Sequence, residues 1–151
     1  MKLKALVGSG DRIGLFTLPF LLAGAALNVA FPAAFAVGGP SPILAWVSVV
    51  VLAVGVVVWA WSVVLILRDV PRGRLITSGP FAVVRHPLYT GVALLVLPWA
   101  GFLLNTWLGA ALGIVLFAAS RTFEPLEERA LATQFGAAWE RYTAGVKIAW
   151  L

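Results

Sequence analysis

The chain of 151 residues is long enough for one domain, and it is far more apolar than a water-soluble domain of that size. Hydrophobic residues make up 62% of it and charged residues 11%, so we expect lipid as its main solvent and an all-α polytopic membrane bundle as its fold. One histidine and no cysteine exclude disulfides, a cysteine nucleophile and thiolate metal sites, and they argue against zinc. The basic residues behind the net charge of +5 flank the apolar runs, which favours membrane lipids over nucleic acid as their partner.

The first apolar run, residues 13–37, carries no charge over 25 residues and exceeds the roughly 20 residues of a transmembrane helix. Two prolines and Asn28 interrupt it, so we expect a kink or a partner for the Asn28 amide. Residues 34–36 resemble a signal-peptide cleavage site, but the run is longer than the roughly 7 to 15 apolar residues of a signal peptide. We therefore favour an uncleaved span over cleavage.

The second apolar run, residues 43–67, is rich in valine, follows an uncharged turn and has two tryptophans near its end. In lipid a helix is favoured over a strand, because an unpaired strand would leave its amides unsatisfied. After the polar loop 68–91, residues 92–120 form a third apolar region that Asn105 and Thr106 divide. Each half is short for a full crossing, so the region predicts a short helical hairpin, with a re-entrant hairpin as the alternative.

The last segment, residues 121–151, is rich in charge and belongs at the water boundary. Pro125 fits the first turn of a new helix or a kink in the old one, and Gly136 is a helix-terminating residue. A second short helix over 137–143 would place three aromatic side chains on one side, where they either line a site or anchor the chain in the membrane. These are Phe135, Trp139 and Tyr142.

The basic residues predict the orientation of the chain, a single membrane domain. They fall in the N-terminal tail, the 68–91 loop and the C-terminal segment, whereas the other two turns have none. The positive-inside rule then gives four spans with both termini and the 68–91 loop in the cytoplasm, as in a bacterial-type cytoplasmic membrane. The pattern identifies no protein partner.

Residues 79–91 read Gly-Pro-Phe-Ala-Val-Val-Arg-His-Pro-Leu-Tyr-Thr-Gly and hold the candidate site. Two prolines and two glycines argue against one uninterrupted helix. Arg85, His86 and Tyr89 supply a fixed cation, an imidazole and a phenol, and the hairpin brings them near Glu127 and Glu128. Such a mixture suits a zwitterionic, polyhydroxylated ligand with a flat base.

Each of these side chains also has a structural interpretation. Arg85 is at the right depth to hold a lipid phosphate, and His86 alone is typical of a histidine bonded to a backbone carbonyl. Glu127 and Glu128 point about 100° apart on a helix, so both cannot face one ligand squarely. At least one of them would then be a solvated charge.

The motif resembles that of the isoprenylcysteine carboxyl methyltransferase and phospholipid methyltransferase family, whose members are integral membrane enzymes that use S-adenosylmethionine. The resemblance covers roughly the C-terminal half of the chain. It rests on residues 79–81 and 85–91 and on a second set of residues, Glu127, Glu128, Leu131, Phe135, Gly136, Trp139 and Tyr142.

The resemblance implies methyl transfer to a lipid-like or prenylated acceptor, a carboxylate or an amine, at the cytoplasmic face. The catalytic residues implied are Arg85, His86 and Glu128. The implied cofactor-binding residues are Arg85, His86, Pro87, Tyr89, Gly91, Glu127, Glu128, Leu131 and Tyr142.

Departures from the family pattern leave the acceptor open. Phe81 and Trp139 stand where tyrosine is common, and the tail after Val146 lacks the usual arginine and proline. Membrane sterol reductases that bind NADPH carry a similar Arg-His-Pro-X-Tyr segment, but they are much longer and tend to have asparagine in place of Leu88. A reductase and a non-catalytic membrane protein are therefore the alternatives.

Overall fold

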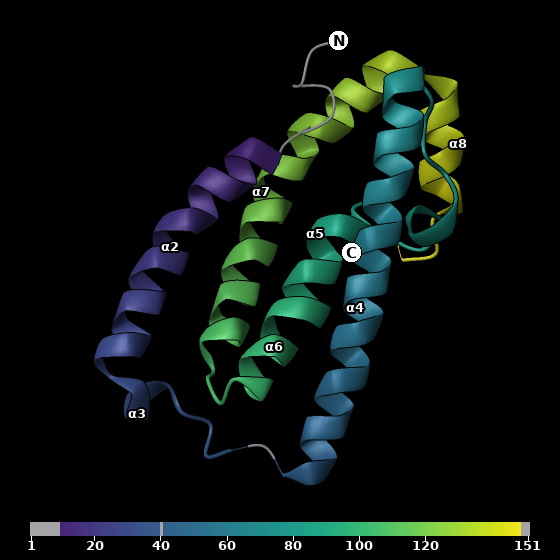
Figure 1. Ribbon diagram of the computed structural model, residues 1–151. Coiled ribbons are helices and arrows are strands. Elements are labelled where there is room, and N and C mark those ends of the chain that lie inside the picture. Colours follow the sequence, from purple (N-terminus) through teal and green to yellow (C-terminus); the bar gives the residue numbers. More distant parts are fainter. Residues whose placement is uncertain (1–9, 40, 149–151) are drawn as a thin grey trace.

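The structure is a computed structural model that describes residues 10–39 and 41–148, and within these ranges every regular element is helical (Figure 1). This confirms the predicted all-α fold. Two helices, α2 (Gly10–Ala30) and α4 (Pro42–Asp69), are long and apolar enough to cross a membrane. The basic N-terminal tail and the last three residues, on which parts of the predictions rest, lie outside the described residues.

Helix α2 ends earlier than the sequence predicts. The uncharged run continues to residue 37, but α2 stops at Ala30 and a four-residue helix, α3 (Pro32–Phe35), follows it. Phe31 leaves the helical region with φ −132° and ψ 60°, because the ring of the following proline disfavours helical backbone at the residue before it. Residues 13–37 are therefore one apolar run but two helices.

Helix α4 is one uninterrupted helix of 28 residues, as the predicted second span requires. It begins at Pro42, whose missing N–H costs nothing at that position, and the Ser41 hydroxyl accepts a hydrogen bond from the Leu44 amide at 3.3 Å. The 3-10 turn η1 (Val70–Arg72) continues it, and Gly73 ends it in the left-handed region at φ 63°.

The first arm of the hairpin is a continuous helical segment of 17 residues, Pro87–Leu103, and it starts within the predicted loop 68–91, earlier than the predicted residue 92. Its parts are α5 (Pro87–Gly91), the π-helical turn η3 (Val92–Val96) and α6 (Leu97–Leu103). Pro98 has no N–H to donate to the helix, and the wider π turn lies just before it. The chain then reverses at Asn105, which takes a positive φ of 55°, so the predicted turn is confirmed.

The second arm of the hairpin is much longer than predicted. Helix α7 (Leu108–Phe135) runs for 28 residues through Pro125, so the expected end at residue 120 is wrong and Pro125 begins no new helix. In Figure 1 the C-terminal half of α7 leans toward α4, as expected for a proline inside a helix. Gly136 ends α7 at φ 49°, as predicted, and α8 (Ala137–Gly145) follows.

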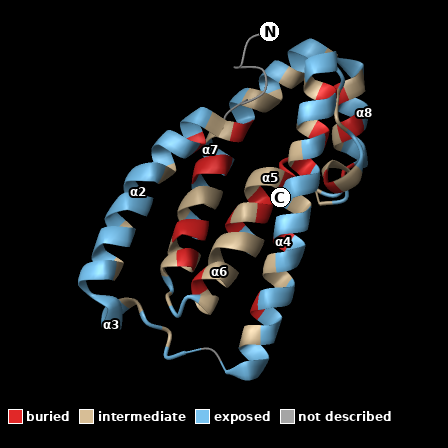
Figure 2. Ribbon diagram, viewed as in Figure 1, coloured by how far each residue is buried: buried red, intermediate tan, exposed pale blue. Residues whose placement is uncertain are grey.

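Helices α2 and α4 lie on opposite sides of the hairpin formed by α5, α6 and α7 (Figure 1). Their apolar surfaces face outward, and the buried residues gather on α4, α5, α6 and α7 (Figure 2). The α6–α7 contact is close because both helices present glycine there. A Cβ on Gly109 would overlap the Leu97 carbonyl oxygen. An apolar exterior over an interior of small residues is the arrangement of a bundle packed in lipid.

The bundle has two unlike ends. At the turn end, residues 31–41 and 104–107, the predicted partner of Asn28 is found, since Thr106 Oγ1 donates to Asn28 Oδ1 at 2.8 Å. The Trp107 indole donates to the Ala34 carbonyl at 2.9 Å. The motif end, residues 68–91 and 121–148, carries the charged side chains. Figure 1 shows the turn end at the bottom and the motif end toward the top.

Candidate active site

The Arg-His-Pro segment occupies a break between helices, as its prolines and glycines predict. A 3-10 turn, η2 (Gly79–Ala82), opens it with Gly79 at φ 63°. His86 then caps α5 in a non-helical conformation, and Pro87 is the first residue of that helix, where its missing N–H is tolerated. This geometry fixes the side chains of Arg85 and His86 at the start of a buried helix.

Arg85 and His86 meet one carboxylate oxygen from the other arm of the hairpin. Nη1 of Arg85 lies 2.9 Å from Oε1 of Glu128, and Nε2 of His86 lies 3.2 Å from the same oxygen. The hydrogen bond with His86 is the main reason that the pKa of Glu128 lies below its usual value, although burial opposes it. Glu128 is therefore an anion at neutral pH, held between a guanidinium and an imidazole.

A pocket of about 590 Å³ opens beside this cluster, within the range of about 300 to 1,000 Å³ that is usual for small-molecule sites. The structure brings most of the predicted cofactor-binding residues to its wall, but Gly91 and Glu128 do not line it. Gly91 is buried at the end of α5, facing Val58 of α4. Those that line the pocket are Arg85, His86, Pro87, Tyr89, Glu127, Leu131 and Tyr142.

The two neighbouring glutamates have different surroundings. Glu127 lines the pocket, and Glu128 points at Arg85 and His86 instead. This is the divergence of about 100° expected for consecutive helical residues. Glu127 is therefore the glutamate that faces the pocket, whereas Glu128 contacts Arg85 and His86.

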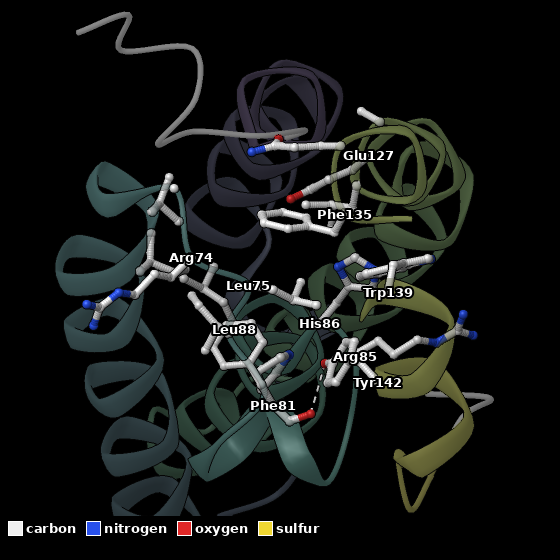
Figure 3. A pocket seen from close by; sticks show the side chains of 18 of the residues that line it. Arg74, Leu75, Phe81, Arg85, His86, Leu88, Glu127, Phe135, Trp139 and Tyr142 are labelled. Carbon is white, nitrogen blue, oxygen red and sulfur yellow. Dashed lines mark hydrogen bonds between the residues drawn. The ribbon is translucent and has the colours of Figure 1, made fainter. Parts of the chain in front are cut away.

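Helix α8 covers one side of the pocket. Trp139, Tyr142 and Val146 form a buried cluster against Leu75, Leu131 and Phe135, so Trp139 and Tyr142 face inward and are not membrane anchors. The Tyr142 hydroxyl donates to the Phe81 carbonyl at 2.9 Å (Figure 3). Burial raises the pKa of Tyr142 to about 12, so the phenol keeps its proton.

The sequence did not single out several residues of the pocket. Leu75 and Ile76 come from the loop after η1, Ile66 from the end of α4, Val70 from η1, and Gly10 from the start of α2. Arg74 also lines it, but Figure 3 shows its guanidinium directed outward. Nothing in the local pattern of these residues marks a site, because tertiary packing brings them together.

An apolar helical bundle with a charged pocket at one end is the architecture expected of a membrane protein that binds a small molecule at the lipid–water boundary. The model of the isoprenylcysteine carboxyl methyltransferase (ICMT) family matches residues 43–133. This is more than half of the chain, and the chain belongs to that family. Comparisons with curated proteins and with solved structures give no match.

Family membership confirms that the chain is a methyltransferase that uses S-adenosylmethionine and that it resides in the membrane. The acceptor class of the family is prenylated or lipid-like. The match spans α4 to α7, so α2 and α8 lie outside it although Gly10, Trp139 and Tyr142 from these helices line the pocket.

The residues of the pocket fit S-adenosylmethionine. Arg85 matches its carboxylate, Glu127 matches its ammonium or ribose hydroxyls, and Phe135 and Trp139 offer aromatic surface for its adenine. Among the described residues no group of three or more His, Asp or Glu is arranged to hold a metal ion.

Proposed function

We propose that this protein methylates the carboxylate of a prenylated or similarly lipid-like acceptor at the cytoplasmic face of the membrane. The observation that supports this most is that charged and aliphatic side chains line the same pocket. Its lining combines Arg85, His86 and Glu127 with aliphatic side chains from the end of α4 and the loop after η1. Such a pocket accommodates a charged cofactor and an apolar acceptor together.

Bound S-adenosylmethionine supplies a methyl group already activated on a sulfonium. The chain then has to orient the two reactants and exclude water, which contributes about 7 to 11 kcal/mol in well-oriented intramolecular reactions. We assign this orientation to Arg85 and Glu127, with the α8 cluster excluding water. Glu128 fixes Arg85 and His86 by its two contacts.

A carboxylate acceptor fits the state of His86 better than an amine acceptor. A carboxylate needs no base, whereas an ammonium group must first lose a proton. Nε2 of His86 faces Glu128 at 3.2 Å, and the imidazole is 7% exposed. A carboxylate acceptor requires no proton transfer to this ring, so its contact with Glu128 can stay in place throughout the reaction.

Transfer of a labelled methyl group tests the acceptor. The purified protein in detergent would be given methyl-labelled S-adenosylmethionine with a prenylated cysteine or, separately, with an aminophospholipid. Label that mild alkali releases as methanol from the prenylated cysteine product identifies a methyl ester. Alkali-stable label in the aminophospholipid alone would overturn the carboxylate assignment.

Calorimetry tests the cofactor independently of the acceptor. We expect S-adenosylmethionine or its demethylated product to bind and NADPH not to bind. Binding of NADPH without S-adenosylmethionine would contradict the assignment and favour a reductase.

We further propose that both termini and the motif end face the cytoplasm. The uncharged turn end and the basic motif end support this through the positive-inside rule. Because the chain has no cysteine, single cysteines report the side directly. Those at Ser41 and Thr106 should react with an impermeant thiol reagent from outside, and those at Ser78 and Thr133 should not. External labelling at Ser78 would reverse the orientation.

A further inference from the structure

Glu124 is a buried carboxyl group that the functional assignment above does not use. It is 2% exposed, and Nη1 of Arg121 is 3.5 Å from its Oε2. Across residues 10–39 and 41–148, its Oε1 has no hydrogen-bond partner. A buried ionised carboxylate normally has both oxygens satisfied, so the burial and the unsatisfied Oε1 favour the neutral acid, whereas the ion pair of Oε2 with Arg121 favours the anion.

Glu124 lies one helical turn before Glu128, on the same face of α7. That face packs against the start of α5, where His86 is the capping residue. Asp11 and Arg12 of α2 and Glu140 and Arg141 of α8 are exposed, and η3 and α6 carry no titratable side chain. The groups that act on Glu124 electrostatically are His86, Arg121 and Glu128.

The two carboxyl groups are driven apart by their surroundings. Burial raises the pKa of Glu124 and outweighs the opposing effects of His86, Arg121 and the Ser120 hydroxyl. The hydrogen bond with His86 lowers the pKa of Glu128. His86 and Arg121 act on both carboxyl groups. Two neighbouring carboxyl groups do not ionise equally, and their different environments leave one protonated and the other ionised.

We propose that Glu124 is a positioning residue that keeps a proton beneath the Arg85–His86–Glu128 cluster, so that Glu128 carries the negative charge. When Glu124 is neutral, His86 and Arg85 interact with the carboxylate of Glu128 alone. As the pH rises through the titration of Glu124, a second anion forms one turn from the first, repels it and competes for His86. The consequence for turnover rests on the proposed function, whereas the protonation state does not.

Infrared spectroscopy of the purified protein in detergent tests the protonation state without any cofactor. The chain has six Asp and Glu residues, so the carbonyl stretch of one protonated carboxylic acid is resolvable. We expect this band near neutral pH in the wild type and in the matched control Glu140→Gln, which changes an exposed carboxyl. It should be missing from Glu124→Gln and should fade in the wild type as the pH rises. Absence of the band in the wild type, or its persistence in Glu124→Gln, would refute the proposal.

The pH dependence of turnover tests the positioning role. The turnover number of the wild type should fall as Glu124 ionises, and Glu124→Asp, which keeps a titrating group, should retain a fall. Glu124→Gln should lose this inflection and match the wild type at the acidic side. A pH profile of Glu124→Gln that superimposes on the wild-type profile would refute the role. A turnover number lowered by the same factor at every pH would refute it too, because that is the effect of a purely structural contribution. If Glu124→Gln fails to fold, the wild-type infrared band still decides the protonation state.

Discussion

The two ends of the bundle satisfy their polar groups in different ways. At the turn end the partners are neutral: Thr106 bonds Asn28, and Asn105 Oδ1 accepts from the Gly39 amide at 2.7 Å. At the motif end a charged cluster adjoins a pocket of about 590 Å³. The two ends therefore have different roles in the molecule. Neutral bonds close the bundle at one end, while the other keeps charge and open volume where a ligand can use them.

The largest effect on binding is expected at the shared carboxylate of the motif end. Glu128→Gln keeps the shape and removes the charge held by Arg85 and His86. Because Glu128 does not line the pocket, the expected loss is that of the Arg85 contact it holds in place, a charge-assisted bond worth about 1.5 to 3 kcal/mol, or up to about a hundredfold in S-adenosylmethionine affinity. Arg85→Lys should also weaken it, because lysine lacks the planar two-pronged geometry. Calorimetry on both variants measures this, with Glu140→Gln as the exposed control.

The lowered pKa of Glu128 gives the pH dependence of that cluster. Its folded-state pKa is depressed, so its stabilising effect is present above the ordinary carboxyl pKa of about 4.3 and is lost as the pH falls through the depressed value. Cofactor affinity should therefore remain near its neutral value down to mildly acidic pH. A loss of affinity already near neutral pH that Glu128→Gln abolishes would contradict this.

The close α6–α7 contact should give the largest effect on stability. Gly109→Ala places a Cβ against the Leu97 carbonyl oxygen, and the helices must separate to admit it, at a cost of about 1 to 3 kcal/mol. Unfolding in mixed micelles measures the loss. Gly14→Ala is the matched control, since a Cβ there meets nothing within 4 Å. Equal stability of the two variants would show that the close contact is not required.

A smaller effect is expected where α8 is tied to the motif end. Tyr142→Phe keeps the ring in its cluster and removes the hydrogen bond to the Phe81 carbonyl. This should cost about 0.5 to 1.5 kcal/mol, and proteolysis within α8 should become faster. Cofactor affinity should fall by less than in Glu128→Gln. An effect as large as that of Glu128→Gln would mean that the phenol contacts the ligand itself.

The smallest effect is expected at the turn end. Thr106→Val removes the hydroxyl that bonds Asn28 while keeping the shape of the side chain. Hydrogen bonds between membrane helices average about 0.6 kcal/mol, so stability should fall slightly and cofactor affinity should stay unchanged. A change in cofactor affinity would show that the two ends are coupled.

Strong local signals made parts of this fold predictable. Gly136 and Asn105 end or reverse helices where their types indicate, and the Arg-His-Pro segment breaks the chain as its prolines require. Pro125 left two outcomes open in the sequence, the first turn of a new helix or a kink in the old one. In the structure the flanking helical turns continue through it.

The site was predictable in its charged residues and, through the family resemblance, in Pro87, Tyr89, Leu131 and Tyr142, but not in the rest of its apolar lining. Arg85, His86 and Glu127 are rare residues in an apolar chain and therefore conspicuous. The rest of the apolar lining comes from residues such as Leu75 and Ile66, which resemble dozens of others. Glu124 looks like an ordinary surface acid in the sequence, and its burial depends on how α7 packs.

The attachment of α2 has a consequence for how the protein is assembled. This helix packs mainly against α7, lies outside the region matched by the family model, and is joined to α4 through residues 31–41. Membrane helices insert as separate units before they associate. Helix α2 should therefore be separable from the rest: expressed as its own fragment, it should dock beside α7 and complete the pocket wall at Gly10 without a covalent link.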